Sequence, residues 1–460
     1  MTSNMKPPNF LVIITDQQQA EALSCAGNAD VHTPHLDRLS AAGVRFRNSY
    51  CTYPMCVPSR RSMLTGKMPN QVGRTGPRPQ DCDLDLSEQD WARTLGRLLE
   101  AAGYRCGWGG KWHVGLGSGS CHVPDRRQGN HGFEAVCPFD DNALPTACEA
   151  FFRQRDQQPF LLVASFDNPH NIGEFSTDRV LPWCEGSIDA VAPAELPNLP
   201  AKFPAAPLEP EVVTAVRQSE RYTVGRDQDF DPLRWRQERH GYYQMVEYVD
   251  AQIGQVMQAL ERAGHADSTV VIFTSDHGEM LGAHQLARKW VLYEESVKVP
   301  LIVCDPHGGR QGITDDLLIS NGIDLLPTLC EYAGIEPPDG LPGVSLVERI
   351  RHGDAVGRDQ LIVETDLPGP HGSWGRMVRT ARYAYHLYGQ GRRNEQLFDL
   401  KNDPGQMVNL AIQQRYRDVL DAHRRRLADW CKNAGNRGMQ HYARPGCVWI
   451  PGLGWIPCNR

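Results

Sequence analysis

The sequence lacks the features that would assign it to a membrane, fibrous or repeat class. It has no apolar run of about 18 residues, the length that a membrane-spanning helix needs, and its first apolar stretch covers only residues 9–15. The polar residues 1–8 do not have the layout of a signal peptide. As written, the sequence therefore predicts a cytoplasmic protein, or a periplasmic or secreted one if a signal has been removed. It contains no internal repeat or low-complexity tract.

Positive charge is not in excess either. The 460 residues include 48 Lys and Arg against 55 Asp and Glu, a formal net charge of -7. Such a chain has no global positive field with which to hold nucleic acid or an anionic membrane surface. We expect neither as a partner, so any anionic ligand must be met by a local cluster of cations.

The cysteines lack a pattern although they are numerous. The chain has 14 of them, scattered without a repeated C-x-x-C motif. This distribution favours reduced thiols over a disulfide framework. Only Cys431, Cys447 and Cys458, in or near the Trp- and Gly-rich tail, are candidates for pairing.

What the sequence does contain is a regular alternation of elements. With 40% apolar and 22% charged residues it has the composition of a globular protein. Apolar β-rich runs alternate with helical patterns, which is typical of a parallel sheet covered on both faces. The predicted strands are 10–15, 159–166, 268–274 and 299–303, and the predicted helices are 33–43, 91–102, 242–262 and 323–333.

The pattern changes towards the C-terminus. Short strands at 361–365, 379–388 and 396–400 precede a helix at 409–430, which indicates an antiparallel sheet. We therefore predict an α/β fold in which residues 1–355 form a large, mostly parallel sheet between layers of helices. Residues 356–460 would form a smaller α+β domain with the antiparallel sheet, a helix and the Trp/Gly/Cys tail. Residues 172–231, rich in Pro and poor in periodicity, are interpreted as a long insertion or an active-site rim.

Polar residues follow three of the predicted strands. Asp16 and Gln17 come after the first strand, His170 after the strand that ends at 166, and Asp276 with His277 after the strand that ends at 274. Ligands of open α/β sheets bind beyond the carboxyl ends of the strands. Any one of these residues alone is more often a cap or a solvated loop residue, but their shared position favours a site.

The segment from Cys56 to Gly66 carries the most information. Pro58 predicts a first helical turn there, which sets Cys56 at a helix N-terminus, where free N–H groups and the positive end of the dipole favour an anion. Arg60 adds a cation. A cysteine of a globular protein is more often a buried structural thiol, but these neighbours favour a functional one.

These residues resemble a known family. Cys56-x-Pro-Ser-Arg60 with the following Leu64-Thr-Gly66 is similar to the signature of the type I, formylglycine-dependent sulfatases of the alkaline phosphatase superfamily. The remaining similar motifs keep the family's order over about residues 9–425, at 9–16, 110–113, 168–170, 274–278, 287–301 and 397–410. The resemblance implies an alkaline-phosphatase-like sheet.

The resemblance also implies a divalent cation, held by Asp16, Gln17, Asp276, His277 and the modified residue 56. Hard carboxylate and amide oxygens suit Ca²⁺ or Mg²⁺, whereas Cys-rich sets suit zinc. Gln17 departs from the commoner second aspartate of the family, and His277 stands where some members have asparagine. This set favours Ca²⁺ and leaves Mn²⁺ and Mg²⁺ as alternatives.

In this family a separate formylglycine-generating enzyme oxidises the cysteine, here Cys56, to formylglycine. The hydrated aldehyde carries two hydroxyls on one carbon, and one of them attacks sulfur. His170 or Lys289 would give the leaving alcohol its proton. His113 would then take the proton of the second hydroxyl, so that sulfate leaves by elimination and the aldehyde returns. A thiol has no second hydroxyl, which is why unmodified Cys56 should fail.

Three cations complete the implied site. Arg60 would stabilise the hydrate, and Lys111 with Lys289 would clamp the sulfate. Each lysine in isolation is more often an ordinary surface residue. Only the motifs around Lys111 and Lys289 favour the functional interpretation.

Several other residues stay without an assigned role. His32 and His35 invite a ligand interpretation, but at a helix start they are more often structural. Asp167, Asn168 and Glu279 flank matched positions and carry nothing that the resemblance transfers.

A Gly-rich turn of the smaller domain holds His371, Trp374 and Arg376. These residues could form a substrate subsite, although a surface loop is the default. Like the 172–231 insertion, the turn does not by itself reveal the substrate.

Three functions follow from these observations. The leading hypothesis is a sulfatase that hydrolyses the sulfate ester of an alcohol, chiefly on a sugar, and releases inorganic sulfate. The second is a phosphonate or phosphate ester hydrolase on the same scaffold, since some relatives combine formylglycine with Asp-Gln and Asp-His motifs. The third, from another class, is a silent protein that binds sulfated glycans without turnover, which requires that Cys56 is never modified.

Overall fold

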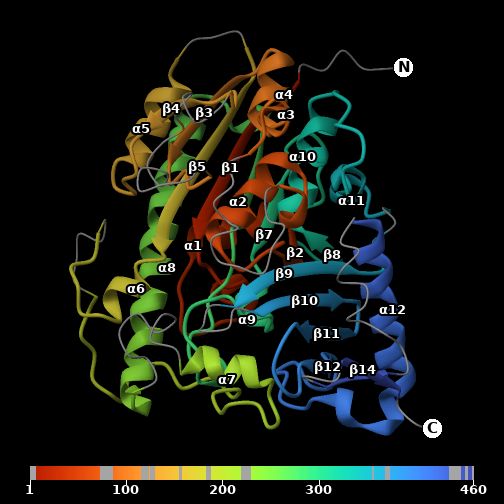
Figure 1. The fold of residues 1–460 in the computed structure, drawn as a ribbon. Helices are drawn as coiled ribbons and strands as arrows, with labels where there is room; N and C mark the ends of the chain where they lie inside the picture. The colour runs from red at the N-terminus through yellow and green to blue at the C-terminus, as the bar shows by residue number, and fades with distance from the viewer. Residues whose placement is uncertain are drawn as a thin grey trace.

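The described residues form three sheets, and the two larger ones lie side by side (Figure 1). The computed structural model describes residues 7–72, 86–114, 124, 130–154, 158–182, 188–218, 229–354, 357–367 and 373–434, and the backbone of 447–450 and 454–457. The larger sheet has eight strands and the smaller has four, and β13 (Cys447–Ile450) pairs with β14 (Gly454–Pro457) near the C-terminus.

The larger sheet has the strand order β4-β3-β5-β1-β6-β7-β2-β8. Its strands are β1 (Asn9–Asp16), β2 (Val44–Tyr50), β3 (Arg105–Gly110), β4 (Glu134–Cys137), β5 (Phe160–Pro169), β6 (Thr269–Ser275), β7 (Leu301–Cys304) and β8 (Ile313–Ser320). β1 pairs in parallel with β5 and β6, whereas β7 runs antiparallel to β6 and β2. The carboxyl ends of β1, β5 and β6 therefore meet at one edge.

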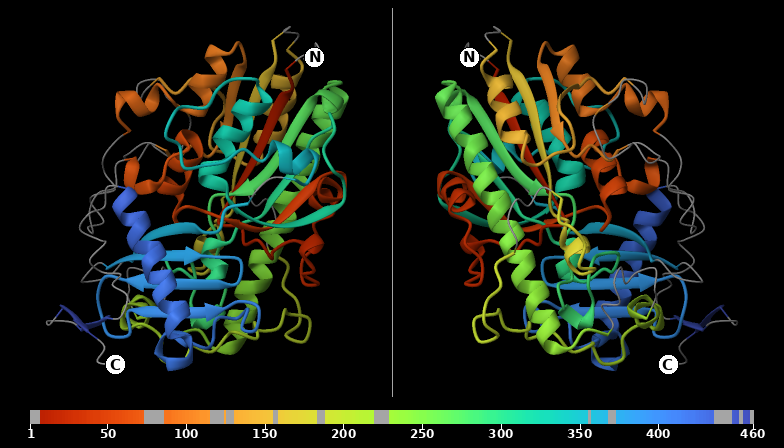
Figure 2. Two further views of the ribbon diagram at one scale, coloured as in Figure 1. Left: turned by 90° about the vertical axis from the view of Figure 1, so that its right-hand side faces the viewer. Right: turned by 90° about the vertical axis from the view of Figure 1, so that its left-hand side faces the viewer.

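The alternation of side chains along β1 explains the layers. Phe10, Val12 and Ile14 point to one face, where they join a buried cluster with residues of α2 (Cys56–Thr65), α4 (Leu95–Ala101) and α10 (Asn321–Tyr332). Leu11 and Ile13 point to the other face, against α1 (Pro34–Ala42), α5 (Leu144–Phe152) and α8 (Pro232–Arg262). Helices thus cover both faces of the sheet (Figure 2), as a strand buried on both sides requires.

The smaller sheet is antiparallel, with the order β12-β11-β10-β9. Its strands are β9 (Leu361–Leu367), β10 (Ser373–Arg379), β11 (Tyr383–Tyr388) and β12 (Glu395–Asp399). One face packs on α12 (Arg417–Asn433) through Leu420 and Leu427. The other face joins a cluster with Tyr50 of β2.

β9 also touches the segment that leads to Cys56. The Glu364 N–H donates to the Thr52 carbonyl over 2.9 Å. The Tyr53 hydroxyl lies 3.2 Å from the Asp366 carboxylate and accepts the Asp366 N–H at 2.7 Å. The smaller sheet therefore forms part of the wall behind the N-terminus of α2.

The predicted fold class is confirmed, with local differences in the elements. α8 begins at Pro232 rather than 242, because its polar first turns carry no apolar period while Asp231 caps the helix by accepting the Arg234 N–H. The predicted strand 379–388 is the end of β10 and all of β11, joined by a turn, and the helix predicted at 409 begins at Arg417. The predicted domain boundary falls at residues 355–356, outside the described part, and stays a prediction.

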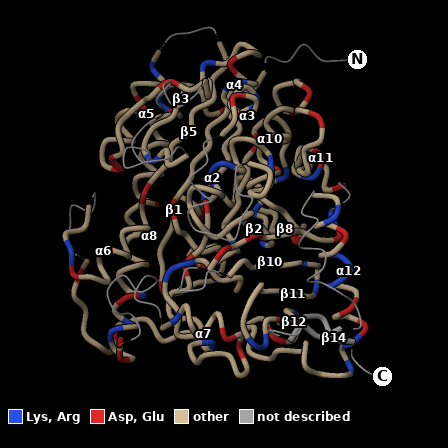
Figure 3. The backbone as a smooth tube through the Cα atoms, viewed as in Figure 1, with Lys and Arg blue, Asp and Glu red and all other residues tan. Residues whose placement is uncertain are grey.

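The 172–231 segment is largely irregular where it is described. It contains only α6 (Ile172–Phe175) and α7 (Glu211–Arg217), while α3 (Glu88–Trp91), α9 (Glu294–Val297) and α11 (Val347–Arg351) are further short helices elsewhere. Among the described residues, no helix combines the length and apolarity needed to cross a membrane. In Figure 3, basic and acidic positions are interspersed over the visible fold.

The cysteines proposed as candidates for pairing are only partly described. Cys431 is a buried free thiol on α12. The side chains of Cys447 and Cys458 lie outside the described residues, so their pairing stays a prediction.

Candidate active site

Helix α2 supplies the first element of the site. It begins at Cys56, and the preceding Met55 is extended and gives it no side-chain cap. Pro58 lies in the first turn, where its missing N–H costs no hydrogen bond. The Cys56 side chain, 4% exposed, therefore lies at the positive end of the helix dipole, as the sequence predicted.

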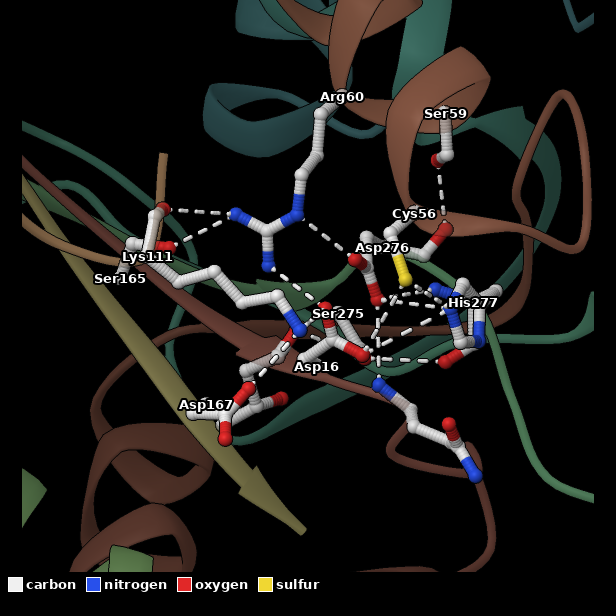
Figure 4. A network of polar contacts seen from close by, with 12 residues as sticks. Asp16, Cys56, Ser59, Arg60, Lys111, Ser165, Asp167, Ser275, Asp276 and His277 are labelled. Atoms are coloured by element: carbon white, nitrogen blue, oxygen red, sulfur yellow. Dashed lines mark hydrogen bonds and ion pairs between the residues drawn. The ribbon is translucent and has the colours of Figure 1, made fainter. Parts of the chain in front are cut away.

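Arg60 follows one turn later and joins two strand ends. Its Nε donates to Asp276 Oδ2 at 2.8 Å, and its Nη2 lies 3.2 Å from Asp16 Oδ2 (Figure 4). Nη1 donates to the Lys111 carbonyl at 3.0 Å and to Ser165 Oγ at 2.9 Å. The pairing raises the pKa of Arg60 despite complete burial, because Asp276 and Asp16 stabilise the charged form. The guanidinium thus fixes β1, β3, β5 and β6 relative to α2.

Four side chains converge next to this arginine. Ligand atoms of Asp16, Cys56, Asp276 and His277 all lie within 4.8 Å of one another, and all four residues are buried. Thr15 pairs with Ser275 in the parallel register of β1 and β6, so Asp16 and Asp276 follow neighbouring positions. The sequence therefore brings the two carboxylates together through strand register alone.

The tautomer of His277 suits a cation. Its Nδ1 lies 3.0 Å from the Gly278 carbonyl, which can only accept, so Nδ1 carries the proton. Nε2 then presents its lone pair to the cluster, 3.3 Å from Cys56 Sγ and 3.6 Å from Asp276 Oδ1. The donor set therefore fits a divalent cation. If Cys56 were converted to formylglycine, an oxygen would take the place that the sulfur occupies.

The electrostatics of the cluster point the same way. Burial raises the pKa of Asp16, but nearby cations, chiefly Lys111, outweigh it and hold that pKa well below its usual range. Burial and the charge of Asp16 raise the pKa of Asp276. For Cys56, burial and the charge of Asp16 raise the thiol pKa. The cations Lys289, Lys111 and His277 outweigh both effects and hold this pKa well below its usual value. A divalent cation among these groups would relieve the repulsion between the two carboxylates.

Two lysines lie beside the cluster, Lys111 directly after β3 and Lys289 in the loop before α9. Lys111 Nζ lies 2.7 Å from Asp16 Oδ2 and 2.8 Å from Asp167 Oδ1, and these carboxylates raise its pKa against the effect of burial. Lys289 Nζ donates to Gln17 Oε1 at 2.6 Å and lies 3.5 Å from Cys56 Sγ. Both lysines are buried rather than surface residues.

The two histidines lie at the ends of strands. His170 directly follows β5, close enough for its charge to lower the pKa of Asp16. His113 lies three residues beyond β3, with a left-handed backbone (φ 46°). The structure thus places eight predicted residues in direct contact, whereas His170 lies near Asp16 and His113 follows Lys111 by two residues; the eight are Asp16, Gln17, Cys56, Arg60, Lys111, Asp276, His277 and Lys289.

Residues outside this group have structural contacts, although Trp374 and Arg376 lie on strand β10 and not in the expected surface turn. The ring of His35 packs against Gly254 of α8, where even a Cβ would approach it within 2.4 Å. Arg376 pairs with Glu364 at 2.7 Å inside the smaller sheet, and Trp374 packs against Gly389. His371 lies outside the described residues.

Sequence reasoning missed several supporting groups. Asp167 holds Lys111, Glu279 holds Gln17, Ser165 accepts from Arg60, and Ser59 Oγ donates to the Asp276 carbonyl at 2.6 Å. Asp167 and Glu279 flank recognised motifs, and that proximity was the available signal.

Comparisons with known proteins agree with this geometry. Residues 8–335 match the family model described as "Sulfatase". The chain belongs to the sulfatase family. Residues 282–433 of the sulfatase also match "N-sulphoglucosamine sulphohydrolase, C-terminal". The chain is a sulfuric ester hydrolase, and the recognised resemblance is confirmed.

Individual relatives span nearly the whole sulfatase. It is 29% identical to a Delta 4,5-hexuronate-2-O-sulfatase of Bacteroides thetaiotaomicron, over 96% of this chain and 92% of the relative. It is 30% identical to an ulvan-active sulfatase of Formosa agariphila, over 88% and 77%. A solved 2-O GAG sulfatase superposes with a TM-score of 0.81 at 27% identity, covering 94% of this chain and 93% of the other. A phosphonate monoester hydrolase from Silicibacter pomeroyi, with a TM-score of 0.76 but 22% identity and coverage of 98% and 99%, shares the fold.

Gly110 offers a test of how closely Lys111 must be held. It has φ 79°, and a Cβ there would lie 2.1 Å from the Ser165 carbonyl, which accepts the Lys111 N–H. We expect Gly110→Ala to displace Lys111 and lower kcat/KM about 100-fold, the size of effect that a misplacement of about 1 Å can have. Gly103→Ala is the matched control, because φ is 90° there but nothing lies within 4 Å. Both variants should lose stability through backbone strain, and equal activities would contradict the expectation.

Proposed function

We propose that the sulfatase hydrolyses the sulfate ester of a sulfated carbohydrate through a formylglycine made from Cys56. The observation that supports this most is the position of Cys56 at an uncapped helix N-terminus, within reach of His277, Lys289 and two carboxylates. The proposal requires a formylglycine-generating enzyme as a partner during maturation. The hydrated aldehyde would supply the attacking hydroxyl and a second hydroxyl that permits release by elimination.

The cation would be held by Asp16, Gln17, Asp276, His277 and the modified residue 56. With an oxygen in place of sulfur at 56, oxygen ligands dominate this set, which favours Ca²⁺ over Mn²⁺ or Mg²⁺. Bound there, the cation would supply positive charge to the sulfate oxygens.

The residues of the chain have distinct tasks in this proposal. Lys111 and Lys289 bind the anionic sulfate group, and Arg60 keeps the two carboxylates in place. His170 or Lys289 donates a proton to the leaving alcohol, and His113 accepts the proton of the second hydroxyl. The burial of Arg60, Lys111 and Lys289 strengthens their charge interactions by excluding water.

The carbohydrate assignment rests on the relatives. Three of them are named as a hexuronate-2-O-sulfatase, an ulvan-active sulfatase and an N-acetylglucosamine-6-O-sulfatase. This chain is 26–30% identical to them over most of its length. A phosphonate or phosphate ester hydrolase remains the second candidate, supported by the shared fold and by the Asp-Gln and Asp-His pairs. Sulfate and phosphonate monoesters both carry a single negative charge, so the cations do not separate them.

A parallel substrate panel tests the proposal. We expect kcat/KM for 4-nitrophenyl sulfate to exceed that for a phenylphosphonate monoester and a phosphate diester at least about 100-fold, a difference of roughly 2.7 kcal/mol in transition-state binding. Among sulfated saccharides, a 2-O-sulfated unsaturated uronate, N-acetylglucosamine 6-sulfate and sulfated ulvan fragments should be assayed for released sulfate. Faster turnover of the phosphorus esters would overturn the sulfatase assignment of the site. Turnover of aryl sulfate alone would contradict the carbohydrate assignment.

A further inference from the structure

The Gln17 side chain is held at both ends of its carboxamide. Its Oε1 accepts from Lys289 Nζ at 2.6 Å, on the side of Cys56. Its Nε2 donates to Glu279 Oε2 at 2.5 Å, on the opposite side. The backbone of Gln17 is also fixed, since its N–H donates to Asp276 Oδ1 at 3.1 Å. The amide therefore lies between a cation and an anion.

Glu279 is itself held in place by the backbone. Its Oε1 accepts the N–H of Leu281 at 3.1 Å and that of Arg288 at 2.5 Å, and the residue is 1% exposed. Its own N–H donates to the Glu295 carbonyl at 2.9 Å. Because Oε1 is occupied, Oε2 is the oxygen that meets Gln17. An ionised carboxylate only accepts hydrogen bonds, so this contact admits only the NH₂ end of an amide.

Both neighbours thus select the same orientation of the amide. A flipped Gln17 would place its carbonyl oxygen against the Glu279 carboxylate and its NH₂ group against the Lys289 ammonium. We propose that Glu279 is a positioning residue, whose carboxylate turns the carbonyl oxygen of Gln17 towards the cation site beside Cys56. This inference rests on the proposed function, in which Gln17 helps to hold a divalent cation.

The reason for such a residue lies in the departure of Gln17 from the commoner aspartate. Either oxygen of a carboxylate can bind a cation, so the carboxylate of an aspartate does not need to be held in one orientation. An amide has a carbonyl oxygen on one side and an NH₂ group on the other, and only the oxygen can bind a cation. A glutamine at this position therefore needs a neighbour that distinguishes its ends.

The decisive variants are Glu279→Gln and the exchange Gln17→Glu with Glu279→Gln. In the single variant, the amide carbonyl introduced at position 279 still accepts the two backbone N–H groups, but its NH₂ group faces Gln17 and favours the flipped amide. We expect a loss of about 10–100-fold in Ca²⁺ and Mn²⁺ affinity, the range of effects from residues that support metal ligands. In the exchange, the carboxylate introduced at position 17 accepts from the new amide with one oxygen and offers the other to the cation. The affinity should then return to within about tenfold of wild type.

The measurement is competition of the metal-stripped, formylglycine-containing enzyme with a chromophoric chelator for Ca²⁺ and for Mn²⁺. Thermal unfolding without metal, and kcat and KM at saturating metal, are measured on the same samples. Glu21→Gln is the matched control, since the Glu21 side chain is 67% exposed and pairs only loosely with Lys298 at 3.8 Å. Its affinity should equal that of the wild type.

The outcomes separate the inference from the proposed function. Restored affinity in the exchange, with the single variant folded but weak, supports the positioning role. Unchanged affinity in Glu279→Gln, or an exchange no better than the single variant, overturns it. If the wild type itself binds neither cation or fails to turn over a sulfate ester, the proposed function fails instead.

Discussion

Cys56→Ala leaves hydrolysis of the sulfate ester at background, a loss of at least about 10⁴-fold, as expected when a nucleophile is removed. The variant should still fold, because the buried side chain loses only a sulfur atom and the ionic contacts of Arg60 do not involve it. Binding of a sulfated saccharide should persist through Lys111 and Lys289. Initial rates and equilibrium binding, measured on the same preparation, check both expectations.

Cys51→Ala is the matched control for this variant. Cys51 lies in the same segment and is fully buried, burial raises the pKa of its thiol, and the residue lies outside the four-residue cluster around Cys56. Its activity should stay near that of the wild type. Hydrolysis that survives in Cys56→Ala would contradict the formylglycine mechanism.

The state of residue 56 is read from the tryptic peptide Asn48–Arg60 after denaturation and thiol alkylation. It contains both cysteines, so alkylated Cys51 is an internal standard for an aldehyde or hydrate at position 56. Two alkylated thiols would mean that the host lacks the modifying enzyme or that the protein is a silent binder. Co-expression with the formylglycine-generating enzyme distinguishes these cases.

Arg60→Met lowers the free energy of unfolding of the metal-stripped protein by about 3–5 kcal/mol, the typical result of removing one partner of a buried ion pair. The Arg60, Asp16 and Asp276 side chains are all 0% exposed, so each carboxylate would lose one compensating charge without gaining water, and only Asp16 would keep Lys111 at 2.7 Å. Urea unfolding followed by fluorescence measures the change. Metal should recover part of the loss, because a cation compensates the same carboxylates.

Arg47→Met provides the comparison on the surface. Arg47 pairs with Asp316 at 2.5 Å, but the two side chains are 55% and 62% exposed. Removing such a pair costs about 0–1 kcal/mol, since water screens the charges. If Arg60→Met unfolds at the urea concentration of the wild type, the bridging role of Arg60 is wrong.

The candidate site could be predicted where its residues sit at the ends of regular elements. The apolar runs of β1 and β6 predicted where these strands end, which is where Asp16 and Asp276 lie. Pro58 predicted the first turn of α2. The predicted strands met in a parallel register, which is why their carboxyl ends lie together. Local sequence therefore predicted that the residues after these strands meet, whereas the ligand set that includes Cys56 came from the family resemblance.

The supporting contacts could not be predicted in the same way. Glu279 meets Gln17 across 262 positions, and Lys111 meets Asp167 across 56. No local period encodes such pairs, because they depend on how loops beyond different strands approach one another. The antiparallel direction of β7 was also missed, because a short apolar run does not indicate in which direction a strand runs.

The contact of β9 with the segment before α2 has a consequence for the order of synthesis. Thr52 and Tyr53 acquire their partners Glu364 and Asp366 only after the ribosome has added more than half of the chain. Until then the wall behind Cys56 is incomplete, and the formylglycine-generating enzyme can bind the nascent chain around the cysteine. Closure by the smaller sheet ends that interval, so the proposed oxidation of Cys56 would compete in time with elongation and folding. Slowing translation between residues 56 and 364 should therefore raise the modified fraction, whereas incubating the folded thiol form with the modifying enzyme should not.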